Sequence, residues 1–200
     1  MAEHLDLARS LRIHVVGVGG AGMSAIASVL AAMGHVVTGS DLKESPGVDR
    51  LRAQGVQVWI GHDPANLPEQ LDAVTISTAV PPDNPEVAAA RARGVPVLRR
   101  AEILAAIAAL RRTVAVAGTH GKTTTSSMLA LVLSEAGLAP SFIIGGEVNE
   151  IGTGAVWGSG ELFVVEADES DGTFLELPRH AALVTNVEPD HLDHYGGVEA

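Results

Sequence analysis

The chain has 200 residues and a formal net charge of -11 at pH 7, from 24 acidic and 13 basic side chains. This charge excludes a general attraction to nucleic acid or anionic membrane surfaces, so any phosphate ligand must be held by a local site. The absence of cysteine excludes a disulfide framework, a thiolate metal site and a cysteine nucleophile, and it fits a cytoplasmic protein.

Composition favours an α/β fold. Hydrophobic residues make up 46% of the chain, whereas aromatic residues make up only 3%. Small aliphatic side chains suit close-packed layers of helices and sheets. The length lies between one large domain and two small ones, and we expect two.

The first half of the chain alternates between strand and helix patterns. Residues 12–18 are mostly apolar, as in a strand covered on both faces. A small-residue helix at 21–33 and a strand at 35–39 follow. Further strands are predicted at 56–60, 73–78 and 95–98, and helices near 48–53, 86–93 and 101–110. This alternation predicts a Rossmann-like domain with a parallel sheet over residues 1–111.

Residues 15–34 also resemble a signal peptide or a membrane helix, because they carry no charge and follow Arg9 and Arg12. Gly17, Gly19, Gly20 and Gly22 would weaken a continuous helix. A buried strand, a glycine turn and a buried helix describe the segment better, and we expect no membrane insertion.

The strand and helix pattern restarts after Arg112. A strand at 113–117 leads into a second glycine loop and a helix at 122–136, and later strands are predicted at 141–144, 162–167 and 182–186. The chain stops at Ala200 without a closing helix or strand. We therefore expect residues 112–200 to form an incomplete P-loop ATPase-type α/β domain.

The first motif, residues 17–22, reads G-x-G-x-x-G between a strand and a helix. Its glycines permit a tight turn and close approach of a diphosphate to the helix N-terminus. Asp41 ends the next strand, where a ribose-binding carboxylate is expected, although a turn or cap role is equally open. The motif does not distinguish NAD or FAD from another nucleotide, and glycines used only for packing remain an alternative.

The second motif, residues 118–124, reads GTHGKTT between a strand and a helix. Its backbone N–H groups and the helix dipole converge on a phosphate-sized space. Lys122 supplies a cation for the β- and γ-phosphates of ATP, and Thr123 a hydroxyl for Mg²⁺. The strict motif has glycine where this chain has Val116, so the loop is a shortened relative.

Acidic and histidine residues follow two later strands. Glu166, Asp168, Glu169 and Asp171 stand where open α/β sheets bind ligands, and Glu166 is the best candidate for Mg²⁺, against a solvated acidic turn. Residues 186–194 hold a second cluster that faces a metal or a phosphate, with a zinc site as the rival. The isolated histidines are interpreted as packing or surface residues: His4, His35 and His180.

In this order, five segments resemble the Mur ligase family: 17–24 (GVGGAGMS), 39–41 (GSD), 118–125 (GTHGKTTT), 166–171 (EADESD) and 185–191 (TNVEPDH). The resemblance covers essentially the whole chain. It implies a cytoplasmic step of peptidoglycan synthesis, in which ATP phosphorylates the carboxylate of UDP-N-acetylmuramate and L-alanine attacks the acyl phosphate. The glycine-rich first loop favours this alanine-adding branch over the related branch that recycles tripeptide.

The resemblance also implies roles for individual residues. Lys122, Glu166 and His191 would be catalytic, and Thr123, Glu166 and His191 would hold Mg²⁺, supported by Asn186 and Asp190. The UDP-sugar would be bound by Gly17, Gly19, Gly20, Ala21, Gly22, Asp41, His62, Ser77 and Thr78. ATP would be bound by Gly118, Thr119, His120, Gly121, Lys122, Thr123 and Thr124.

Two other functions remain open at this point. An NAD-dependent oxidoreductase would need only the Gly17 loop and Asp41. A noncatalytic nucleotide-binding or regulatory module is favoured only if the end of the chain at Ala200 is natural. Family members carry a C-terminal domain that these 200 residues do not include, so we expect no ligase turnover from them alone. The sequence does not determine the oligomeric state.

Overall fold

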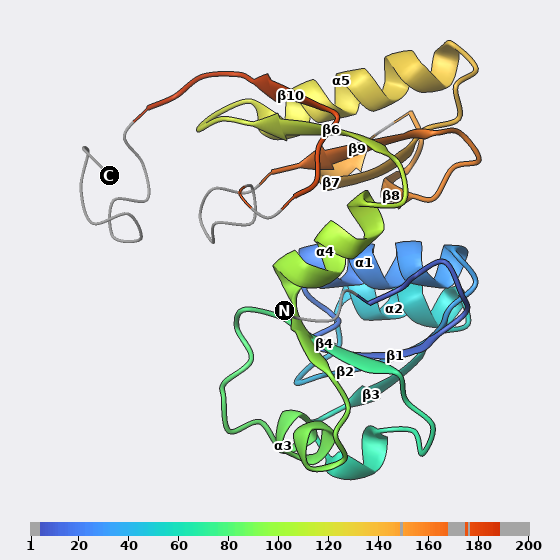
Figure 1. The fold of residues 1–200 in the computed structure, drawn as a ribbon, viewed down its shortest axis with the longest axis vertical. Coiled ribbons are helices and arrows are strands. Elements are labelled where there is room, and N and C mark those ends of the chain that lie inside the picture. Colours follow the sequence, from blue (N-terminus) through green and yellow to red (C-terminus); the bar gives the residue numbers. More distant parts are fainter. Residues whose placement is uncertain (1–4, 149, 168–174, 176, 189–200) are drawn as a thin grey trace. The chain divides into compact units, whose positions relative to one another are not determined.

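The computed structural model describes residues 5–148, 150–167, 175 and 177–188. Figure 1 shows two compact units, Met1–Ala106 and Ile107–Ala200. The division falls inside helix α4 (Arg100–Ala108), a little before the boundary expected from the sequence. Each unit is an α/β structure, which confirms the predicted fold class.

Unit 1 contains a five-stranded parallel sheet in the order β3-β2-β1-β4-β5. Its strands are β1 (Arg12–Val16), β2 (Val36–Asp41), β3 (Gln57–Ile60), β4 (Ala73–Ile76) and β5 (Val97–Arg99). The chain runs outward from β1 to β3 and then returns to β4 on the other side of β1. This reversal creates a crevice at the carboxyl ends of β1 and β4, the position at which such sheets bind ligands.

Helices cover both faces of this sheet. Figure 1 shows α1 (Ala21–Ala32) and α2 (Pro46–Ala53) on one face, and α3 (Pro85–Ala92) with the 3₁₀ helix η1 (Pro64–Asn66) on the other. β1 lies at the centre, and Ile13, Val15 and Val16 are fully buried. Across the described part of the chain, no helix has the length and apolar character needed to span a membrane.

Unit 2 contains a mixed five-stranded sheet in the order β10-β6-β9-β7-β8, with α5 (Lys122–Glu135) packed against it. Its strands are β6 (Arg112–Ala117), β7 (Ser141–Val148), β8 (Thr153–Val156), β9 (Leu162–Glu166) and β10 (Ala181–Val184). β6, β9 and β10 are parallel neighbours. Their carboxyl ends therefore meet at one edge, where the second glycine loop, Glu166 and Thr185 lie.

Among the strands of the described residues, β8 is the one that was not predicted from the sequence. It pairs antiparallel with β7, and the pairing shifts register between Ile143 and Val148. Its residues are all half-buried, and Gly152 and Gly154 interrupt any apolar run. Because glycine and partial exposure weaken the periodic signal of a strand, the pattern was too faint to recognise.

Candidate functional site

A cavity of about 580 Å³ opens at the carboxyl ends of β1, β2 and β4 in unit 1. It lies at the crevice that the strand order creates. The predicted substrate residues that line it are Gly17, Gly19, Gly20, Asp41, His62 and Ser77. Among the described residues, Ala21, Gly22 and Thr78 are not part of its lining, and Thr78 is exposed to solvent.

The first glycine loop fits tightly against β2 and β4. Gly17 has a φ of +77°, and a Cβ atom there would lie 3.0 Å from the Cβ of Ser77. The backbone N–H of Gly19 donates to Oδ2 of Asp41 at 2.7 Å. Asp41 thus holds the turn and also lines the cavity; its contact with a ribose stays a prediction.

The helices that follow the two glycine loops lack side-chain caps. α1 begins after Gly20 and α5 after Gly121, and neither has an acidic residue in its first turn. By contrast, Ser45 caps α2 and Asn84 caps α3. The first-turn amides of a helix have no intrahelical carbonyl partners, so α1 and α5 each present uncapped N–H groups suited to an anion.

Two cations near the first loop were missed by the sequence analysis. Lys43 lines the cavity. Arg100 approaches Gly22 so closely that a Cβ there would lie 3.0 Å from its Nε. Both residues follow strand ends, but an isolated Lys or Arg after a strand is too common a signal to single out.

A buried carboxylate lies behind the cavity wall. The side chain of Glu86 is fully buried, and its Oε1 accepts hydrogen bonds from Nδ2 of Asn66 at 2.7 Å and the backbone N–H of Asp63 at 3.2 Å. Its Oε2 accepts from Oγ of Ser40 at 2.5 Å. Two histidines flank Oε2, with Nε2 of His14 at 3.6 Å and Nδ1 of His62 at 3.4 Å.

These contacts determine the charge of Glu86. Burial raises its pKa, but His14 and the hydrogen bonds from Ser40 and Asn66 outweigh burial and lower the pKa from 4.5 to about 2. Glu86 is therefore an anion at neutral pH. Of this cluster, His62 was predicted from the sequence, whereas Glu86, Asn66 and His14 were not; the signal that could have pointed to them was His14, a titratable residue in the middle of a buried strand.

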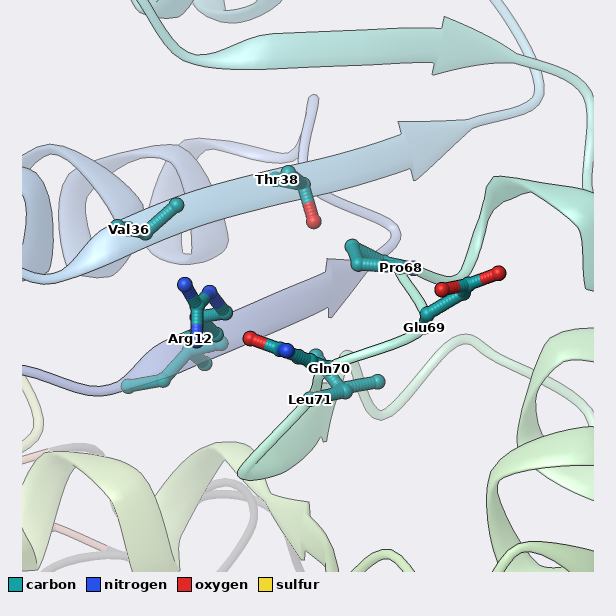
Figure 2. Close-up of a pocket in the computed structure, with 8 residues that line it drawn as sticks. Arg12, Val36, Thr38, Pro68, Glu69, Gln70 and Leu71 are labelled. Carbon is teal, nitrogen blue, oxygen red and sulfur yellow. The ribbon is translucent and has the colours of Figure 1, made fainter.

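A smaller cavity of about 290 Å³ lies at the other end of the sheet. Figure 2 shows its lining, which joins Arg12 and Val36 at the starts of β1 and β2 to the segment before β4. Pro68, Glu69, Gln70 and Leu71 supply that segment. Because open α/β sheets bind ligands at the carboxyl ends of their strands, the larger cavity is the candidate site.

In unit 2, the second glycine loop connects β6 to α5. Gly121 has a φ of +81° and precedes the first residue of α5. Nζ of Lys122 donates to the carbonyl oxygen of Gly118 at 2.7 Å and to that of Thr119 at 3.2 Å. The ammonium group is thus held against the loop that precedes α5.

The segment after β10 clamps this loop. The Asn186 side chain accepts from the backbone N–H of His120 and donates to its carbonyl oxygen, each at 3.0 Å. Gly118 has a φ of +129°, and a Cβ there would collide with Thr185 Oγ1 and lie 2.8 Å from the Asn186 carbonyl oxygen. Glycine is therefore required at 118. The Asn186 contacts hold the loop in place, whereas the support of a Mg²⁺ site by Asn186 stays a prediction.

Glu166 and Thr123 approach the same point. A Cβ at Gly145 would lie 2.6 Å from Oε2 of Glu166 and 3.7 Å from Oγ1 of Thr123. The Ser126 hydroxyl lies within hydrogen-bond distance of two acceptors. Its Oγ is 2.9 Å from Oε1 of Glu166 and 2.7 Å from the carbonyl oxygen of Lys122, and the two acceptors share its single proton. Two oxygens suited to Mg²⁺ therefore converge, and Gly145 and Ser126, which the sequence analysis missed, shape their surroundings.

Several predicted residues lie outside the described part of the chain: Asp168, Glu169, Asp171, Asp190, His191 and His4. Within the described part, no three or more His, Asp or Glu side chains are arranged so that they could hold a metal ion. His35 packs in the core, where burial lowers its pKa. His180 is exposed beside Arg112. Both match the packing and surface roles expected of them.

Comparison with known proteins identifies relatives of both units. The model of the Mur ligase family catalytic domain matches residues 12–112, and the Mur ligase middle domain matches residues 116–200. UDP-N-acetylmuramate–L-alanine ligase of Acidiphilium cryptum is 58% identical over 188 residues, which are 94% of this chain and 39% of the relative. That of Saccharopolyspora erythraea is 56% identical over 193 residues, with the same coverage. The chain thus spans about 40% of the length of the curated relatives it matches.

Solved structures agree with these sequence relatives. UDP-N-acetylmuramate-alanine ligase from Thermotoga maritima matches with a TM-score of 0.86 and 34% identity over 94% of this chain and 44% of that chain. UDP-N-acetylmuramate:L-alanyl-gamma-D-glutamyl-meso-diaminopimelate ligase from Neisseria meningitides matches with a TM-score of 0.85 and 33% identity over 96% of this chain and 65% of that chain. The fold alone therefore does not separate alanine addition from peptide addition.

Proposed function

Because the chain belongs to the Mur ligase family, we propose that it carries the UDP-sugar site and the ATP site of an enzyme that joins L-alanine to UDP-N-acetylmuramate. The reaction would be a cytoplasmic step of peptidoglycan precursor synthesis. The observation that carries the proposal is the presence of two uncapped helix N-termini after glycine loops, one in each unit, in a chain whose curated relatives are named as this ligase.

The cavity of unit 1 suits UDP-N-acetylmuramate. Amides at the start of α1 and the cation of Lys43 match a diphosphate. Asp41 matches a ribose hydroxyl, and His62 and Ser77 line the region assigned to the uridine. Ala21 and Gly22 lie in the first turn of α1 and would contribute backbone amides, and Thr78 stays a predicted contact.

The loop of unit 2 suits ATP with Mg²⁺. The amides at the start of α5 and Nζ of Lys122 match the phosphates, and Thr123 with Glu166 offers two hard oxygen ligands. Mg²⁺ keeps several waters and phosphate oxygens in its shell, so two protein oxygens are sufficient. When bound, the ion would neutralise charge on the phosphates. His191 stays a predicted further ligand.

These residues would promote activation of the sugar carboxylate. A carboxylate is a poor electrophile. Its conversion to an acyl phosphate provides phosphate as a good leaving group, which is displaced when the amine of L-alanine attacks the acyl carbon. Lys122 would stabilise the negative charge that develops on the transferring phosphoryl oxygens. Ser126 would hold the Glu166 carboxylate toward Thr123.

Calorimetric titration of the chain tests the proposal. We expect saturable binding of UDP-N-acetylmuramate, and Mg²⁺-dependent binding of a non-hydrolysable ATP analogue, with NADH as the competing ligand. Binding of NADH without binding of UDP-N-acetylmuramate would reject the ligase site in favour of the oxidoreductase alternative. That alternative is not favoured, because it explains neither Lys122 nor the ligase relatives.

A further inference from the structure

His62 stands between the nucleotide cavity and the buried anion of Glu86. Its ring lines the cavity, yet its side chain is only 11% exposed. Nδ1 of the ring lies 3.0 Å from Oγ of Ser40 and 3.4 Å from Oε2 of Glu86. Within the described chain, no hydrogen bond engages Nε2 of His62. One ring nitrogen therefore faces the buried cluster, and the other is left for the cavity.

The protons of this cluster can be assigned in sequence. Asn66 and the Asp63 amide donate to Oε1 of Glu86, so Oε1 accepts. The anionic Oε2 also accepts, and the single hydroxyl proton of Ser40 goes to it. Ser40 Oγ then has only lone pairs left for His62, so Nδ1 of His62 must carry the proton. The direct contact between His62 Nδ1 and Glu86 Oε2 requires the same proton.

We propose that Glu86 is a positioning residue for the nucleotide site: through Ser40 it holds His62 in the Nδ1–H tautomer, so that Nε2 accepts a hydrogen bond from an N–H or O–H group of the bound uridine nucleotide. The claim that Nε2 accepts a hydrogen bond from a bound uridine nucleotide rests on the proposed function. Because Glu86 itself is fully buried, a ligand in the cavity would not touch it. It acts on the site only through the direction of two hydrogen bonds.

The neutral variant Glu86→Gln should reverse these hydrogen bonds. Asn66 and the Asp63 amide still require an acceptor at Oε1, so the new amide nitrogen occupies the place of Oε2. This nitrogen donates to Ser40, whose proton then turns to His62. Nδ1 of His62 becomes an acceptor and Nε2–H a donor, which opposes a donor on the ligand.

Nitrogen-15 NMR of the imidazole rings tests the tautomer directly in the nucleotide-free chain. In slightly alkaline buffer, the wild-type His62 signals should show a protonated Nδ1 and an unprotonated Nε2, and Glu86→Gln should interchange them. His62→Asn identifies the signals by their loss. The wild-type spectrum alone decides the assignment if Glu86→Gln does not fold, and a wild-type ring protonated at Nε2 overturns the proposal.

Titration with UDP tests the consequence for binding. Glu86→Gln and His62→Asn should each weaken UDP binding at least about tenfold, the equivalent of one hydrogen bond. The double variant should bind no more weakly than either single variant, because both remove the same acceptor. Glu69→Gln, an exposed carboxylate of unit 1, should bind as the wild type does. Losses that add in the double variant overturn the positioning role.

Modified nucleotides identify the donor. UDP methylated at the uracil ring N–H, and UDP lacking either ribose hydroxyl, are titrated into the wild type and His62→Asn. The analogue that lacks the donor to His62 should bind more weakly than UDP to the wild type, and it should bind equally to the wild type and to His62→Asn. If no analogue behaves in this way, the acceptor role of His62 is overturned. If the wild-type His62 ring is in the Nδ1–H form but the chain does not bind UDP, then the hydrogen bond from the nucleotide to Nε2 and the proposed function are both rejected. If the wild-type His62 ring is instead protonated at Nε2 and UDP binds tightly, then the further inference is rejected and the proposed function stands.

Discussion

Lys122 and Lys43 offer a test of the two sites at the level of single residues. Each is a cation beside an uncapped helix, one in unit 2 and one in unit 1. Lys122→Ala should weaken binding of an ATP analogue roughly tenfold to hundredfold, the effect of one charge-assisted hydrogen bond, and should leave binding of UDP-N-acetylmuramate unchanged. Lys43→Ala should do the reverse. Calorimetric titration of both ligands into both variants checks this, and equal ATP affinity in Lys122→Ala and the wild type would contradict the assigned role.

Gly118 is the residue at which backbone conformation and packing are both decisive. Its φ of +129° strains any other residue, and a Cβ would collide with Thr185 Oγ1. Gly118→Ala should therefore destabilise unit 2 by about 2 to 4 kcal/mol, from strain and overpacking together. Gly137→Ala is the matched control, because Gly137 also has a positive φ, +75°, but nothing within 4 Å. Denaturant titration measures both, and an equal loss in the two variants would show that the collision is relieved without cost.

At the level of elements, helix α3 places Glu86 behind the cavity of unit 1. Oδ1 of Asn84 accepts from the backbone N–H groups of Glu86 and Val87 at 2.9 and 3.2 Å, and Pro85 takes the first helical position. This arrangement begins the helix at a defined residue. It also places the Glu86 carboxylate in the first turn, where the helix dipole stabilises an anion.

Loss of this cap is predicted to reduce both stability and nucleotide binding. Asn84→Ala should destabilise unit 1 by about 1 to 2 kcal/mol, since two amides lose their acceptor. UDP binding should weaken as well, because Glu86 moves with the helix end. Asn84→Ser restores a capping oxygen and should recover most of the stability in urea titrations. If Asn84→Ala binds UDP as tightly as the wild type does, the prediction that the helix cap influences UDP binding is contradicted.

At the level of the whole molecule, the buried anion makes stability depend on pH. The pKa of Glu86 is lowered from 4.5 to about 2 in the folded protein, so the folded state binds fewer protons than the unfolded state between these values. The stabilisation is fully present above about pH 4.5 and is lost as pH falls toward 2. Its size is on the order of 3 kcal/mol, from the size of the shift.

Glu86→Gln isolates this contribution from that of the other carboxylates. The free energy of unfolding of the wild type should exceed that of the variant by its largest margin near neutral pH. The margin should shrink as the pH falls from about 4.5 toward 2, because the carboxyl of the unfolded wild type takes up its proton before that of the folded protein. Urea unfolding of both proteins across this range gives the margin, and a constant difference would mean that Glu86 is not held as an anion.

Much of the fold and part of each site could be predicted from the sequence, because the signals are local. The alternation of apolar strands and helices was confirmed element by element, with ends displaced by a few residues. The glycine loops, Lys122 and Thr123 form continuous motifs. The Mur ligase resemblance was confirmed by the family models. The site roles of Asp41, Glu166 and His191 stay predictions.

Tertiary structure alone decided which distant residues meet. Strand order brings Gly17 beside Ser77, and register places His14, Thr38 and Ser40 on the sheet face that α3 covers, where Glu86 is buried. β8 is recognisable only through its pairing with β7. A sequence pattern reports local periodicity and turn chemistry, whereas a buried hydrogen-bond network depends on strand order, register and helix docking. The sequence alone therefore determined the two glycine loops, and the packing around them decided which side chains gather beside the cavity of unit 1.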